Sequence, residues 1–73
     1  MNLAPGTAVL IIHPPGNFEA YTQDGEVVSI EDGIITVKFF ADQIRTCRFH
    51  QSNGTCVDTR LEAFIVLADP TRF

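Results

Sequence analysis

The chain has 73 residues, so we expect one small domain over residues 1–73, whose limited core would gain stability from association with another chain. Hydrophobic residues make up 45% of the composition and charged residues 19%, which excludes the signature of a disordered chain. The formal net charge of −4 opposes general attraction to nucleic acid, and no apolar run is long enough to span a bilayer. A cytoplasmic protein without membrane contact is therefore expected.

The first predicted strand covers residues 7–12, where β-branched and other apolar residues follow a Pro-Gly pair. It ends before Pro14 and Pro15, because two adjacent prolines cannot continue a sheet. Residues 14–24 are therefore expected to form a long loop. The aromatic residues of this loop are Phe18 and Tyr21.

A β-hairpin over residues 25–40 is the strongest local signal in the sequence. Asp32 and Gly33 separate two runs of strand-forming residues, and an Asp-Gly pair tolerates the positive φ angles of a two-residue type I′ turn. Cross-strand neighbours in the resulting register are Glu31 with Ile34, Ile30 with Ile35, Val28 with Val37, and Glu26 with Phe39.

This register assigns each hairpin residue to a buried or an exposed face. The predicted buried face consists of Val28, Ile30, Ile35, Val37 and Phe39. The predicted outer face is mostly polar and consists of Val27, Ser29, Thr36, Lys38 and Phe40.

The second half of the chain adds more short elements. We expect a strand over residues 44–50, a turn at 51–54 and a short strand over 55–58. Residues 59–63 predict one helical or 3₁₀ turn, and residues 64–67 a last strand. Such an all-β layout fits a small five-stranded barrel that is closed or nearly closed. The alternatives are an OB-type barrel and an open sheet that dimerises edge to edge.

Three short patterns lie in the expected strands: Pro-Gly-x-x-Val (Pro5, Gly6, Val9), Gly-x-Val-x-x-Ile (Gly25, Val27, Ile30) and Ile-x-Val-x-Phe (Ile35, Val37, Phe39). With this layout, the chain resembles the SH3-like small β-barrels, a group that includes Tudor and KOW modules. The resemblance implies binding of peptides, modified side chains or nucleic acid, and in a few members a role as an enzyme subunit. Because the chain has no tryptophan, a groove for Pro-rich peptides is not expected.

We expect neither catalysis nor a cofactor, because no motif gathers a nucleophile, a base and an orienting group. His13, His50, Cys47 and Cys56 are residue types that bind zinc, but they lack the close ligand pairs of zinc ribbons, so no metal site is predicted. The turn at 51–54 places both cysteines on one face, where two buried free thiols are the simpler interpretation. A disulfide between them would require a turn centred on the first two residues of that segment.

The outer face of the hairpin and the long loop form the candidate binding surface. Exposed Val27 and Phe40 on a polar face favour a protein partner or self-association. We therefore expect a non-enzymatic protein-interaction module. The aromatic residues Phe18, Tyr21 and Phe40 would either cover the end of the barrel or form a cage for a methylated cation.

A nucleic-acid-associated barrel is the main alternative, with basic side chains on phosphates and aromatic rings on bases. The basic residues would be Lys38, Arg45, Arg48 and His50. In a variant of this hypothesis, the acidic surface imitates nucleic acid. The alternative from the enzyme class is an oligomer with its active site in a central pore.

Overall fold

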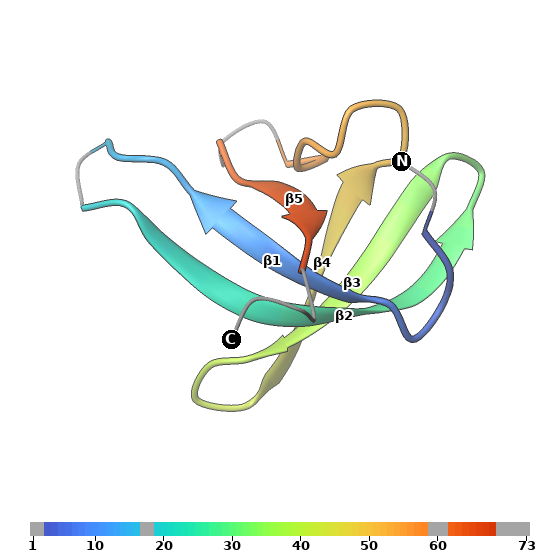
Figure 1. Cartoon of the computed structure of the whole chain (residues 1–73), viewed down its shortest axis with the longest axis horizontal. Helices are drawn as coiled ribbons and strands as arrows, with labels where there is room; N and C mark the ends of the chain where they lie inside the picture. The colour runs from blue at the N-terminus through green and yellow to red at the C-terminus, as the bar shows by residue number, and fades with distance from the viewer. Residues whose placement is uncertain (1–2, 17–18, 59–61, 69–73) are drawn as a thin grey trace.

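The computed structural model describes residues 3–16, 19–58 and 62–68, which form one antiparallel sheet of five strands in the order β4-β3-β2-β1-β5 (Figure 1). The strands are β1 (Ala8–His13), β2 (Tyr21–Glu31), β3 (Ile34–Phe40), β4 (Ile44–His50) and β5 (Phe64–Leu67). None of the described residues is helical, and this part of the chain accordingly holds no apolar helix of membrane-spanning length. The prediction of a small all-β protein is confirmed.

Strand β2 is longer than expected, because residues 21–24 extend it into the predicted loop. These residues pair with β1, and the ladder closes with Tyr21 opposite His13. Residues 55–58 form no strand, since they contribute only two isolated bridges, Phe49 to Cys56 and Thr55 to Phe64. Of the predicted helical turn, residues 59–61 lie outside the described residues and residues 62–63 are not helical.

The predicted turn at Asp32 and Gly33 is confirmed. Both residues have positive φ angles, 52° and 75°, as a type I′ turn requires. The first cross-strand pairs also agree with the prediction, since Ile30 lies opposite Ile35 and Glu31 opposite Ile34.

A register shift between Val27 and Ser29 then overturns the rest of the predicted pairing. Val27 pairs with Val37, so that Val28 is the extra residue of a β-bulge, in which two residues face one on the partner strand. As a result, the β2 residues that precede the bulge have their side chains on the face opposite to the predicted one. Val27 is 1% exposed and belongs to the core, whereas Val28 is 46% exposed, which reverses the prediction for both residues.

The sheet does not close into a barrel, contrary to the prediction. Strands β4 and β5 are its two edges and form no ladder with each other, because residues 54–57 lie between them. Five backbone hydrogen bonds connect this segment to β4, to β5 and to Ala63 just before β5. They are His50 N–H to Thr55 O (2.8 Å), Gly54 N–H to His50 O (2.7 Å), Val57 N–H to Arg48 O (2.9 Å), Cys56 N–H to Ala63 O (2.9 Å) and Ile65 N–H to Gly54 O (2.9 Å). We call residues 54–57 the edge connector.

The core lies on the concave side of the bent sheet, where β1 and β5 cross over β3 and β4 (Figure 1). Gly25 allows close approach inside the bend, since a Cβ atom added there would lie 2.7 Å from Cγ1 of Val37. Among the described residues, no buried side-chain nitrogen or oxygen lacks a hydrogen-bond partner. The buried residues are Val9, Ile11, Val27, Ile35, Val37, Phe49, Cys56, Ala63 and Ile65.

Candidate functional site

Two large apolar side chains are exposed together at the end of the β3–β4 hairpin. Phe40 and Ile44 are cross-strand partners, and each is 71% exposed. The turn that joins them is closed by a hydrogen bond from Ala41 N–H to Gln43 O (3.1 Å), and it projects from the body of the molecule as the yellow-green loop in Figure 1. We call Phe40 and Ile44 the apolar pair.

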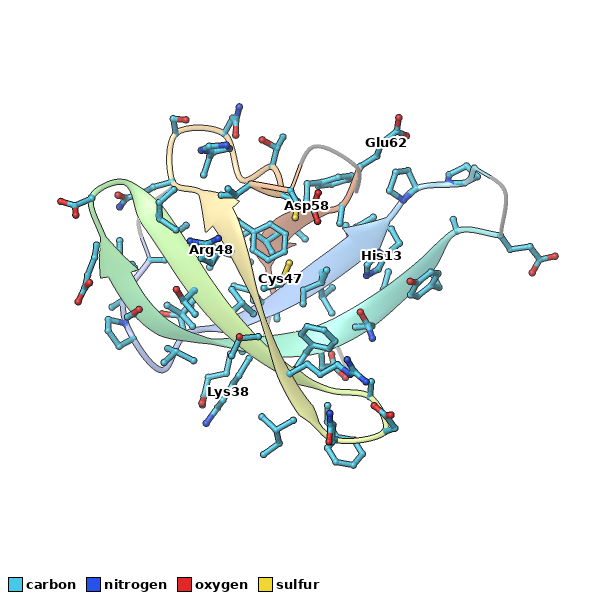
Figure 2. All side chains as sticks on the ribbon, turned by 180° about the vertical axis from the view of Figure 1, so that it is seen from behind. His13, Lys38, Cys47, Arg48, Asp58 and Glu62 are labelled. Carbon is cyan, nitrogen blue, oxygen red and sulfur yellow. The ribbon has the colours of Figure 1, made fainter. Side chains whose placement is uncertain are left out.

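A hollow of about 380 Å³ lies beside the apolar pair. Its rim carries the ion pair between Lys38 Nζ and Glu26 Oε2, which are 3.0 Å apart, and both side chains are about half exposed. The bulge in β2 produces this pair, because it places Glu26 opposite Lys38. Lys38 points outward from β3 in Figure 2. The lining residues are Asp24, Gly25, Glu26, Lys38, Phe39, Phe40 and Ile44.

The charge of Arg45 is balanced by Asp42, three residues earlier. Nε of Arg45 donates to Oδ1 of Asp42 (3.1 Å), and Nη2 donates to Oδ2 (3.3 Å). These side-chain hydrogen bonds lower the pKa of Asp42, and backbone hydrogen bonds lower it further. The turn between β3 and β4 therefore carries paired charges next to the apolar pair.

The outward edge of β4 is only partly covered. Hydrogen-bonding sides alternate along an antiparallel strand, so the outward bonds of Arg48 and His50 to the edge connector place the N–H and C=O groups of Ile44 and Thr46 on the same outward side. Within the described residues, no backbone hydrogen bond reaches that part of the edge. We call residues 44–46 the free edge.

The predicted aromatic residues are not brought together in the described structure. Phe18 lies outside the described residues. Tyr21 is exposed and stacks on His13, with 4.2 Å between ring centroids and 9° between planes, while His13 Nε2 hydrogen-bonds Gln23 Oε1 (2.9 Å). Since Tyr21 shares its face of the sheet with Gly25 and therefore with Phe39, it lies on the opposite face from Phe40.

Three of the four predicted basic residues share the outer face of β3 and β4. Lys38 lies opposite Thr46, and the exposed residues Arg48 and His50 follow on β4 at two-residue intervals. Arg45 lies on the other face, opposite Phe39. Acidic side chains lie among these basic ones. Lys38 forms an ion pair with Glu26, and a second hollow of about 290 Å³ is lined by Arg48 together with Glu31 and Asp32. The outer face therefore has mixed charge.

The two cysteines lie on one face, as predicted, but only Cys56 is buried and Cys47 is half-buried. Cys47 Sγ and Cys56 Sγ are 3.6 Å apart, and both cysteines are free. Burial, followed by the neighbouring thiol of Cys56, raises the pKa of Cys47 to about 11. Neither histidine joins them, because the described residues contain no group of three or more potential metal ligands.

Sequence reasoning named Phe40 but missed Ile44 and the ion pair of Glu26 with Lys38. Ile44 could have been found by extending the pairing from β3 into β4, which sets the first residue of β4 opposite the last residue of β3. The ion pair was hidden by the bulge. Val27, proposed as an exposed binding residue, is buried and is removed from the candidate site.

Comparisons of this chain with known protein families, with curated proteins and with solved structures found no match.

Proposed function

We propose that the protein is a non-enzymatic protein-binding module that associates with a second copy of itself through the free edge and the apolar pair. The observation that carries the proposal is the joint exposure of Phe40 and Ile44, which are neighbours across the β3–β4 ladder. Removing large apolar side chains from water drives association, and an exposed pair of this kind favours a contact surface.

The free edge supplies directional bonds to the same surface. An uncovered strand edge presents N–H and C=O groups that an extended segment of another chain can pair with. A two-fold axis at Arg45 sets Ile44 of each chain opposite Thr46 of the other, which gives a closed symmetric interface. Asp42 balances the charge of Arg45 within each chain, so that the two guanidinium groups can approach.

The charges around the apolar pair also support a protein partner. Lys38 and Glu26 neutralise each other at the rim, which leaves an apolar centre within a polar border, as in protein interfaces. The resemblance to SH3-like small barrels belongs to the same proposal. It is supported by the bent five-stranded sheet and by the edge connector, which links strands that a closed barrel would pair directly.

Sedimentation velocity over a range of concentrations tests the proposal. We expect the unaltered chain to show a reversible monomer–dimer equilibrium. Phe40→Asp and Ile44→Asp should weaken dimerisation at least about tenfold, since each places a charge in an apolar contact. Leu67→Asp is the matched control, because Leu67 is 57% exposed on β5 at the opposite edge of the sheet, and it should dimerise like the unaltered chain.

A second pair of variants tests the edge itself. Thr46→Pro removes the outward N–H but leaves the bonds of β4 to β3, whereas Thr46→Ala keeps the N–H. Only the proline variant should lose dimerisation, with a circular dichroism spectrum that shows the sheet intact. A strictly monomeric unaltered chain at every concentration would overturn the proposal. So would binding of a short oligonucleotide that requires Arg48, weakens with salt and is indifferent to Phe40→Asp.

A further inference from the structure

The two cysteines lie where β4 meets the edge connector. Phe49 on β4 pairs directly with Cys56, so Cys47, two residues earlier on the same face, is the diagonal neighbour of Cys56. Their sulfur atoms are in contact at 3.6 Å. Cys56 belongs to the core at 7% exposure, whereas Cys47 is half-buried.

An opening leads to this pair from solvent. A hollow of about 290 Å³ is lined by both cysteines together with Arg48, Val57 and Asp58. Figure 2 shows Cys47 and Arg48 as near neighbours on β4, with Asp58 above them. Because Cys47 is the more exposed of the two thiols, a small reagent in the hollow would meet Cys47 first.

We propose that Cys47 and Cys56 are a site of reversible oxidation, at which a low-molecular-weight disulfide such as oxidised glutathione converts the two thiols into an intramolecular disulfide. In the first exchange, the Cys47 thiolate attacks one sulfur of the reagent, forms a mixed disulfide and releases one reduced thiol. In the second, the Cys56 thiolate attacks the Cys47 sulfur and releases the other. The protein loses two electrons and two protons, and the reagent is reduced to two thiols.

The geometry makes the second exchange local. The turn expected for a disulfide would place the two cysteines directly opposite each other, but their diagonal positions already bring the sulfur atoms into contact. The sulfur atoms must approach each other by about 1.5 Å to reach the disulfide bond length. The bond from Val57 N–H to Arg48 O (2.9 Å) holds Cys56 beside Cys47, so the second thiol stays within reach of the mixed disulfide. Formation of an internal disulfide is therefore favoured over a lasting mixed disulfide.

Oxidation would add a covalent link between β4 and the edge connector, which also bonds Ile65 of β5 and Ala63 just before it. A disulfide that closes a loop of this length typically increases the folding equilibrium constant by about a hundredfold. The inference does not depend on the proposed self-association, because Cys47 and Cys56 lie beside the connector rather than at the free edge.

The test uses the reduced full chain in mixtures of reduced and oxidised glutathione, with remaining thiols alkylated before mass spectrometry. We expect an intramolecular disulfide, recognised by the loss of two hydrogen atoms, and a midpoint of thermal unfolding about 10 °C higher or more. Since the thiolate is the attacking species and Cys47 has a pKa of about 11, the rate should rise about tenfold per pH unit near neutrality.

Cys47→Ser and Cys56→Ala are the matched variants, and the alanine keeps the core position apolar. Both should fold and form at most a mixed disulfide. Three outcomes of the unaltered chain would overturn the proposal: only glutathione adducts, only disulfides between chains, or full reduction at every glutathione ratio and pH. The variant Phe40→Asp, which separates the two proposals, should oxidise like the unaltered chain even where it fails to dimerise.

Discussion

Cys47 and Asp42 show how the surroundings of one side chain move its pKa. Hydrogen bonds from Arg45 lower the pKa of the exposed Asp42, which keeps this carboxylate charged beside the apolar pair. Burial and the adjacent thiol raise the pKa of Cys47 to about 11 from a reference value of 9.0. Cys47 is therefore a neutral thiol near pH 7, and its chemistry depends on the small fraction that is ionised.

This shift predicts a loss of stability at alkaline pH. Between pH 9.0 and about 11 the unfolded chain ionises Cys47 while the folded chain keeps the proton, so the free energy of unfolding is unaffected below this window and falls as pH rises through it. Because Cys47 is only half-buried, we expect a loss of about 1 kcal/mol rather than the full value of the shift.

Urea unfolding of the reduced protein from about pH 8 to about pH 11 measures this loss. Cys47→Ala is the reference, since every other titrating group is common to both chains. A difference in stability between the two chains that stays constant across the window would contradict the assignment of the shift to Cys47.

At the scale of the elements, the β2–β3 hairpin separates what a sequence can and cannot specify. The turn at Asp32 and Gly33 was predictable because it depends on two adjacent residues with a known tolerance for positive φ. The bulge at Val28 was not predictable, since adjacent valines give the same local signal on either face. Packing decides the register, because Gly25 must lie against Val37.

The same limit applies to the candidate site. Phe40 was predictable as an exposed residue because β3 has no bulge, so that the alternation of its side chains from the turn is uninterrupted. Val27 was assigned to the wrong face because the alternation on β2 is broken. The pairing that forms the site, Phe40 with Ile44 and Glu26 with Lys38, depends on contacts between strands, which no single segment specifies.

The bulge predicts opposite consequences for two adjacent, chemically identical residues. Val27→Ala should destabilise the fold by about 1 to 3 kcal/mol, because it removes buried methyl groups and leaves a cavity. Val28→Ala should change the stability by less than about 0.5 kcal/mol, since Val28 is largely exposed. Chemical denaturation measures both. A larger loss for Val28 than for Val27 would show that the register continues without a bulge.

For the whole molecule, the edge connector decides where the open sheet can meet another chain. It covers the second half of β4, bonds Ile65 of β5 and Ala63 just before β5, and does not extend over the free edge. An open sheet was among the alternatives from the sequence, but the connector was not foreseen. Its residues carry ordinary turn signals, and its bonds to two distant strands depend on the bend of the entire sheet.

Amide hydrogen exchange should map this division. In dilute solution the N–H groups of Cys56 and Ile65, bonded at the connector, should exchange slowly, and the outward N–H of Thr46 should exchange quickly. At concentrations where the dimer forms, exchange of Thr46 should slow while the other two change little. Slow exchange of the Thr46 N–H in dilute solution would contradict its free position in the monomer. Fast exchange at every concentration would contradict its role in association.

The order of the strands also has a consequence for how the chain folds. The β2–β3 and β3–β4 ladders join neighbours in sequence, whereas β1 reaches its second partner only through contacts such as Val9 with Leu67. Such distant contacts have a higher loop-closure entropy cost than hairpin contacts and form more slowly. Because β5 is synthesised after the other four strands, one edge of β1 is left exposed on the growing chain until β5 is made. A chaperone that shields β1 during synthesis would therefore raise the yield of folded protein.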